Sequence, residues 1–142
     1  MAHISLITLA VGDLTAATHF YETMGWRRSS ASVDGTVAFL RGGAVVLGLF
    51  GRESLAADAG VAPSSGGGPA VALAMNVHTA QDVDETLAAA ARAGGRISKP
   101  AQRTDWGGYS GYFEDLDGHL WEIAHNPGFR LMSDGRVLLP DE

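Results

Sequence analysis

The sequence predicts an α+β fold made of two tandem βαβββ modules. Two observations support this prediction. The halves of the chain repeat one order of patterns, an apolar strand, an amphipathic helix and three further strands. Between them lies 62–69, a run of Ala, Pro, Ser and Gly with the composition of a flexible linker. We expect one domain of 142 residues, with module one at about 1–60, a linker at 61–69, module two at about 70–127 and a tail at 128–142.

The first module begins with an apolar run that leads into Gly12 and Asp13, where a helix opens. Apolar side chains recur along this helix at helical spacing, and Gly25 ends it. Gly42 and Gly43 predict a tight turn between the last two strands, and a short surface helix is expected at 51–58. The predicted strands are 4–11, 26–30, 36–41 and 44–50, and the predicted apolar helix face is Leu14, Ala17, Tyr21 and Met24.

The second module repeats this order with Thr79 as the expected N-cap of its helix and Gly94 as the stop. An acidic turn at 115–118 reverses the last hairpin, and Asn126-Pro127 ends it. The predicted strands are 71–77, 96–99, 109–114 and 119–125, and the predicted apolar helix face is Val83, Leu87, Ala90 and Ala91.

The repeat can be aligned residue by residue. At one offset, Asp13 matches Asp82 and Gly25 matches Gly94; at a second offset, Phe39 matches Phe113 and Gly48 matches Glu122. Glu122 stands out because it lies between Trp121 and Ile123 in an otherwise apolar strand. A carboxylate is costly to bury without a partner, so Glu122 is the first candidate for a functional residue.

Three segments together resemble the vicinal oxygen chelate superfamily. They are Val11-Gly-Asp-Leu14, Phe20-Tyr-Glu-Thr-Met-Gly-Trp26 and the closing Asp115-Leu-Asp-Gly-His-Leu-Trp-Glu-Ile123. That superfamily holds glyoxalase I, extradiol dioxygenases, fosfomycin-modifying enzymes and bleomycin-resistance proteins. The resemblance covers nearly the whole chain, and it implies a glyoxalase/bleomycin-resistance-like fold in which a curved mixed sheet surrounds a cavity.

The resemblance also implies four metal-ligand positions, which fall on Leu6, Gly48, the region of Ala72, and Glu122. Apolar side chains and glycine cannot donate a lone pair, and one carboxylate is a poor site for a catalytic divalent ion. We therefore expect no metal ligands and no cofactor, with a divalent metal as the alternative. For each histidine an ordinary surface or hydrogen-bonded role is favoured over a metal ligand; these are His3, His19, His78, His119 and His125.

Strand alternation predicts which side chains share the concave face. Leu47, Leu49, Trp121 and Ile123 should pack against the helices, and the small side chains of the other face should leave room for a ligand. Trp106 and Tyr109 either pack on the sheet edge or form a wall of the ligand site. The predicted ligand-binding residues are Leu6, Thr8, Gly48, Phe50, Asn76, Trp106, Tyr109 and Glu122, beside Ala72, Ala74 and Leu120 on the concave face.

Composition limits the partners. The net charge is −6, and the ten Lys and Arg residues form no basic stripe, so a nucleic-acid partner is not expected. No apolar run approaches the roughly 20 residues of a membrane span, and no signal peptide is evident. With no cysteine, thiol chemistry is excluded, and we expect a cytoplasmic protein. Nine Arg against a single Lys, with abundant Ala and Gly, indicate a bacterial source. We also expect a homodimer.

Three functions follow from these observations. The first is metal-free binding of a small organic molecule, as in bleomycin-resistance-type proteins that sequester an antibiotic, with Glu122 favouring a cationic or hydrogen-bond-donating ligand. The second is an enzyme of lyase, isomerase or dioxygenase type that uses Glu122 as acid or base, or an unrecognised divalent metal. The third is a scaffold whose cavity is filled by its own side chains.

Overall fold

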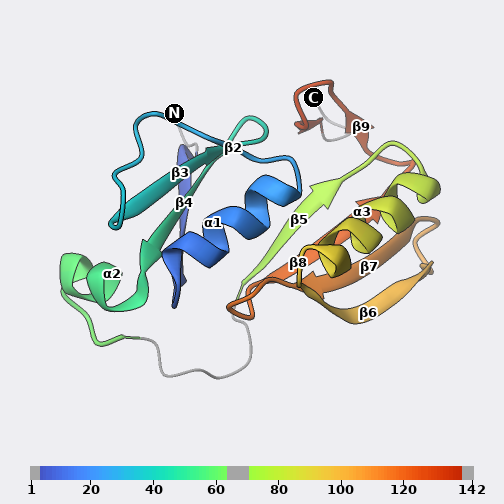
Figure 1. Ribbon diagram of the computed structural model, residues 1–142. Helices are drawn as coiled ribbons and strands as arrows, with labels where there is room; N and C mark the ends of the chain where they lie inside the picture. The colour runs from blue at the N-terminus through green and yellow to red at the C-terminus, as the bar shows by residue number, and fades with distance from the viewer. Residues whose placement is uncertain (1–3, 64–70, 139–142) are drawn as a thin grey trace. The chain divides into compact units, whose positions relative to one another are not determined.

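The computed structural model describes residues 4–63 and 71–138 and divides the chain into two compact units, 1–68 and 69–142. Each unit carries a four-stranded mixed sheet with a helix packed on one face (Figure 1). The predicted α+β fold of two βαβββ modules is therefore confirmed. The boundary lies in the predicted linker, most of which is outside the described residues, as is His3. A cavity enclosed by the two sheets, and their union in one domain, stay predictions.

The first unit follows the predicted order. Asp13 caps α1 by accepting a hydrogen bond from the Ala16 N–H at 3.0 Å, and Gly25 follows the helix with φ +102°. In the sheet the order is β1-β4-β3-β2, with β1 parallel to β4 and the other pairs antiparallel. The elements are β1 (Leu6–Val11), α1 (Leu14–Thr23), β2 (Arg27–Arg28), β3 (Val37–Arg41), β4 (Val46–Gly51) and α2 (Arg52–Ala59).

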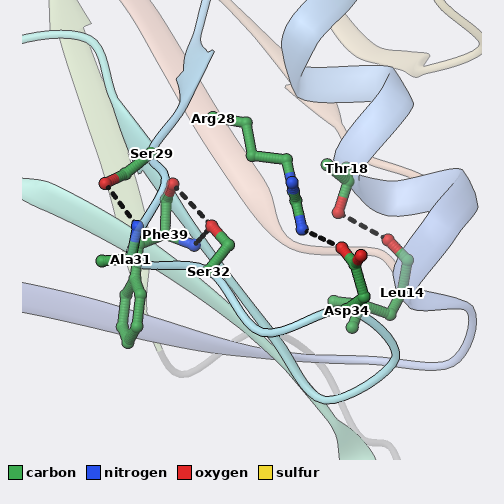
Figure 2. A network of polar contacts seen from close by, with 8 residues as sticks. All are labelled: Leu14, Thr18, Arg28, Ser29, Ala31, Ser32, Asp34 and Phe39. Atoms are coloured by element: carbon green, nitrogen blue, oxygen red, sulfur yellow. Dashed lines mark hydrogen bonds and ion pairs between the residues drawn. The ribbon is translucent and has the colours of Figure 1, made fainter.

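The connection from β2 to β3 is held to the sheet by side-chain contacts, as Figure 2 shows. The Phe39 N–H donates to Ser32 Oγ at 2.9 Å, and the Ala31 N–H donates to Ser29 Oγ at 3.1 Å. Arg28 and Asp34 form an ion pair at 2.5 Å. Because serine side chains compete for backbone partners, the chain leaves the strand at Ser29, and β2 is shorter than the predicted strand at 26–30.

The second unit has the same sheet order, β5-β8-β7-β6, with β5 parallel to β8. Thr79 caps α3 as predicted, accepting from the Asp82 N–H at 3.0 Å. Strand β6 is longer than predicted, and its register shifts twice, between Ile97 and Lys99 and between Lys99 and Gln102. The second shift includes Pro100, which has no N–H for the ladder. The tail adds an unpredicted β9–β10 hairpin. The elements are β5 (Ala72–Asn76), α3 (Ala80–Arg92), β6 (Arg96–Arg103), β7 (Tyr109–Glu114), β8 (Leu120–His125), β9 (Arg130–Leu131) and β10 (Val137–Leu138).

Each helix buries the predicted side of its sheet. α1 packs on β4 and α3 packs on β8, and the four side chains predicted to face the helices are all buried. Ala91 is exposed, so the buried face of α3 is narrower than predicted. Among residues 4–63 and 71–138, no helix has the length and apolarity that crossing a membrane requires. The buried helix-facing residues are Leu47 and Leu49 in the first unit and Trp121 and Ile123 in the second.

Strand pairing corrects one predicted match between the modules. Phe39 lies opposite Gly48 on β3 and β4, whereas the residue opposite Glu122 is Tyr112. The counterpart of Phe39 is therefore Tyr112, and the predicted match with Phe113 is wrong by one position. The reason is turn length: the first hairpin is closed by residues 42–45, a wider turn than the predicted Gly42-Gly43, and the second by residues 115–119.

The helix starts correct a second match. Asp13 and Thr79 are the two N-caps, so the counterpart of Asp13 is Thr79 and not Asp82. The second helix has 13 residues and the first has 10, and the extra turn precedes Gly94. Gly94 has φ +107°, close to the φ of Gly25, so the predicted match of the two glycines holds.

Candidate functional site

Glu122 lies in the middle of β8, flanked by Ala74 on β5 and Tyr112 on β7. The Tyr112 hydroxyl donates a hydrogen bond to Glu122 Oε2 at 3.2 Å. Both side chains are half-buried, on the sheet face that α3 leaves uncovered. The hydrogen bond supplies the partner that an acid in an apolar strand requires, and it fixes the direction of the carboxylate.

The local electrostatics favour a protonated Tyr112. Burial raises the pKa of its hydroxyl above the ordinary value of 10.0, and the negative charge and hydrogen bond of Glu122 raise this pKa further. Tyr112 therefore remains a hydrogen-bond donor at neutral pH. Glu122 Oε1 has no hydrogen-bond partner among residues 4–63 and 71–138, so it can accept from a ligand.

The corresponding position in the first unit is Gly48, with Thr8 opposite it on β1 and Phe39 opposite it on β3. A Cβ added to Gly48 would lie 3.2 Å from Thr8 Oγ1, which is a tight contact. The Thr8 hydroxyl therefore lies close to Gly48, the residue that stands at the position of Glu122. The first unit offers one neutral hydroxyl where the second offers a carboxylate and a phenol.

The metal-ligand positions can be read from the strand register. Leu6 lies opposite Val46, two residues before Gly48, and Ala72 lies opposite Leu120, two residues before Glu122. Ala72 is therefore the counterpart of Leu6, as the sequence predicts. These residues do not fit a metal ion, because only Glu122 carries a donor. In the part of the chain that the structure describes, no three His, Asp or Glu residues form a group that could hold a metal.

The structure brings some of the predicted ligand residues together within each unit. Leu6, Thr8, Gly48 and Phe50 share the open face of the first sheet, and Asn76 and Glu122 share the open face of the second. Their binding role stays a prediction.

The two aromatic residues of the predicted wall separate. Tyr109 lies on the face that α3 covers, where its hydroxyl donates to Asp84 Oδ1 at 2.8 Å. That hydrogen bond is the main cause of a raised Tyr109 pKa. Tyr109 therefore lies on the opposite face of the sheet from Glu122. Trp106 is 48% exposed in the β6–β7 loop, with its ring against Gly108, where an added Cβ would lie 1.9 Å from Trp106 Cζ3.

Sequence reasoning missed Tyr112, although a signal for it was present. In an antiparallel hairpin the turn fixes which residues face each other, so the acidic turn and Glu122 together determine the partner on the preceding strand. A turn at 115–119 places Tyr112 opposite Glu122. The predicted turn at 115–118 is one residue shorter, and with it Tyr112 would not lie opposite Glu122.

Comparisons with known proteins agree with this fold. The family model for the Glyoxalase/Bleomycin resistance protein/Dioxygenase superfamily matches residues 2–123. A glyoxalase-related enzyme from Fulvimarina pelagi is 35% identical, with a TM-score of 0.89 over 98% of this chain and 99% of that one. No curated protein matches the sequence.

Two more distant structures share the fold. A glyoxalase/bleomycin resistance protein/dioxygenase family enzyme from Burkholderia phytofirmans PsJN has 22% identity and a TM-score of 0.77, covering 87% of this chain and 98% of that one. A lactoylglutathione lyase from Agrobacterium tumefaciens has 24% identity and a TM-score of 0.68, covering 89% and 95%. At these identities the likeness concerns the fold alone.

Proposed function

This chain belongs to the Glyoxalase/Bleomycin resistance protein/Dioxygenase superfamily, and from that premise we propose that it binds a small organic molecule without a metal ion. The observation that carries the proposal is the hydrogen bond from Tyr112 to Glu122 Oε2. It orients a single carboxylate on an open sheet face, while the other metal-ligand positions are Leu6, Gly48 and the Ala72 position. A carboxylate in such surroundings is suited to a ligand rather than to a metal ion.

The chemistry around Glu122 favours a cationic or hydrogen-bond-donating ligand. Oε1 is available to accept, and a charge-assisted hydrogen bond to a carboxylate is about twice as strong as a neutral one. Ala72 and Ala74 on the neighbouring strand have short side chains, which leave space beside the carboxylate. Sequestration of a cationic antibiotic, in the manner of bleomycin-resistance proteins, is the form of this function that we propose.

A thermal-shift screen tests the proposal. Cationic aromatic compounds, including glycopeptide drugs, are compared with neutral analogues on the wild type and on Glu122→Gln, which keeps the shape and removes the charge. A bound cation should stabilise the wild type by roughly 2.7 kcal/mol at about a hundredfold excess over its Kd. The glutamine variant should lose most of that shift for cations and little for neutral compounds. Equal cation shifts in both proteins would mean that Glu122 is not the anchor.

The metal-free part of the proposal has its own measurement. The purified protein should hold no stoichiometric divalent ion by elemental analysis, and a chelator should leave its melting temperature unchanged, because one carboxylate binds such ions weakly. About one tightly held ion per chain would contradict this.

An enzymatic role is the second candidate. The relative from Fulvimarina pelagi is described as an enzyme, and a carboxylate held by a tyrosine hydroxyl can accept and return a proton. Turnover of a compound found in the screen, abolished in Glu122→Gln while the fold is intact, would support catalysis. Stoichiometric recovery of the unchanged compound would support binding alone.

A further inference from the structure

A hollow of about 180 Å³ lies within the second unit, at the carboxyl ends of β5 and β8 and beside β9. It is smaller than the roughly 300 Å³ at which pockets for drug-sized ligands begin, so its occupant would be a small molecule. None of its lining residues is a carboxylate, lysine or arginine, in a protein with 16 acidic residues. The hollow is lined by Asn76, Val77, His78, His125, Asn126, Pro127, Phe129 and Leu131.

The polar groups of the hollow have defined roles. His125 Nδ1 lies 3.4 Å from the Val77 carbonyl oxygen, which can only accept. A neutral imidazole with its proton on Nδ1 would donate to this oxygen and would leave Nε2 as an acceptor. Asn126 Oδ1 accepts from the Gly128 N–H at 2.9 Å, which leaves the Asn126 amide nitrogen as a donor.

Asn76 completes this set with one amide oxygen and one amide nitrogen. Its side chain has no hydrogen-bond partner among residues 4–63 and 71–138. The lining therefore offers both donors and acceptors and no fixed charge. Such a set matches a ligand edge that carries a donor beside an acceptor, as a carboxamide does, and it gives no compensation for a charged group.

The apolar lining suits the body of the same ligand. Phe129 is 39% exposed, and Leu131, two residues further along in β9, is half-buried. A planar apolar ring placed against Phe129 would bury part of this surface and gain contact area.

We propose that this hollow is a second binding site, specific for a small uncharged molecule that joins an amide-like edge to a planar apolar body. The hollow adjoins the Glu122 carboxylate and differs from it in chemistry. Asn76 shares the open sheet face with Glu122 and pairs with Ala124, two residues beyond Glu122 on β8. The ligand of the hollow is neutral, whereas the ligand proposed for Glu122 is cationic.

NMR titration of the full chain with benzamide tests this site. Benzoate and benzylamine serve as charged analogues of the same shape, at a pH well above the ordinary histidine pKa of about 6.5. Benzamide should shift the backbone amide signals of Asn76, His78 and Asn126 and should bind more tightly than either analogue. Equal binding of all three probes, or no shift of these signals with benzamide, would overturn the proposal.

Variants separate this site from the proposed function. Asn76→Ala should weaken benzamide binding about tenfold, the equivalent of roughly one neutral hydrogen bond. Asn76→Asp, which is similar in shape, should shift the preference toward benzylamine. Phe129→Ala tests the ring contact independently and should weaken benzamide binding, and its effect on folding should be small because the Phe129 ring is already partly exposed. Glu122→Gln should leave benzamide binding unchanged. Loss of benzamide binding in Glu122→Gln would show that one site accounts for both ligands and would overturn the inference.

Discussion

The two units place different chemistry at the same point of the same sheet. In the second unit Glu122 lies between Ala74 and Tyr112; in the first, Gly48 lies between Thr8 and Phe39. The carboxylate and its tyrosine partner are thus replaced together by a glycine and a phenylalanine. Because the hydrogen bond requires both members, the difference indicates that the polar pair is one functional unit and that only the second unit carries it.

The helix-covered faces show the opposite behaviour. Leu49 and Ile123 occupy equivalent positions, and each is fully buried. Each unit must bury one sheet face under its helix to fold, so this face keeps large apolar residues in both copies. The open face is under no such constraint, and there the copies have diverged. Changes to the covered face should therefore affect stability, and changes to the open face should affect binding.

The largest expected effect lies on the covered face. Phe113→Ala removes a side chain that is 1% exposed and stacked on Trp121 at 6.1 Å, and it should cost about 3–5 kcal/mol of unfolding free energy. Leu40→Ala, at the equivalent position, should cost about 2–5 kcal/mol. Phe39→Ala should cost less, because Phe39 is half-buried on the open face. Urea unfolding measures all three, and a loss for Phe39 as large as that for Phe113 would contradict the corrected match between the modules.

The fold could be predicted largely from the sequence because its signals are local. Periodicity gives the buried helix faces, and the caps at Asp13 and Thr79 and the stops at Gly25 and Gly94 lie where the sequence predicts them. The missed parts depend on tertiary contacts. The extra residue in the second hairpin turn and the short β9–β10 pair leave no periodic pattern. The contact that accompanies the short β2 joins Ser32 in the connecting loop to Phe39 in β3, and no local pattern indicates it.

A smaller effect is expected at the two helix ends. Gly25→Ala and Gly94→Ala should each cost about 1–2 kcal/mol, because φ +102° and φ +107° disfavour a Cβ. At Gly94 the new Cβ would also lie 3.3 Å from Leu116 Cδ2, whereas a Cβ at Gly25 would meet no described atom within 4 Å. Leu116 is exposed and can move, so the two losses should agree closely. Calorimetry on both variants measures them; a stabilising alanine at either position would break the equivalence of the two helix ends.

A still smaller effect is expected at the two helix N-caps, where replacement by alanine should cost about 1 kcal/mol of unfolding free energy each. Asp13→Ala and Thr79→Ala remove side-chain acceptors that satisfy the N–H groups of Ala16 and Asp82. Asp13→Asn and Thr79→Ser keep an acceptor and serve as controls, with little loss expected. Thermal unfolding of these four variants and of Asp82→Ala tests this. An Asp82→Ala loss greater than that of Thr79→Ala would support the predicted match of Asp13 with Asp82.

The candidate site was only partly predictable, for the same reason as the fold. Glu122 is visible in the sequence because a carboxylate interrupts an apolar strand. Its partner Tyr112 depends on the hairpin register, and the position of Tyr109 depends on its contact with Asp84 on α3. The hollow near Asn76 needs the β9 segment, which the sequence presents only as a tail.

The smallest effect concerns the ionisation of Tyr112, which is measured by tyrosinate absorbance. The measurement uses a Tyr109→Phe background, because Tyr109 is the other tyrosine whose pKa is raised by a carboxylate. The folded-state pKa of Tyr112 lies above 10.0, so the folded protein holds this proton more tightly than the unfolded chain. The stability that this group contributes is therefore present below pH 10.0 and is lost as the pH rises through the folded-state pKa. Glu122→Gln should lower the Tyr112 pKa, because the charge is removed, while burial keeps it above the ordinary value.

The first unit provides the matched control for this titration. Phe39→Tyr places a phenol opposite Gly48, and in the described part of the first sheet the residues paired in this row are Gly48 and Thr8, neither of them a carboxylate. In a protein that also carries Tyr109→Phe and Tyr112→Phe, the new tyrosine should titrate at a lower pKa than Tyr112. If Glu122→Gln leaves the Tyr112 titration unchanged, the carboxylate and the phenol do not interact in solution. The polar pair would then not distinguish the two units, and the anchor role proposed for Glu122 would lose its structural basis.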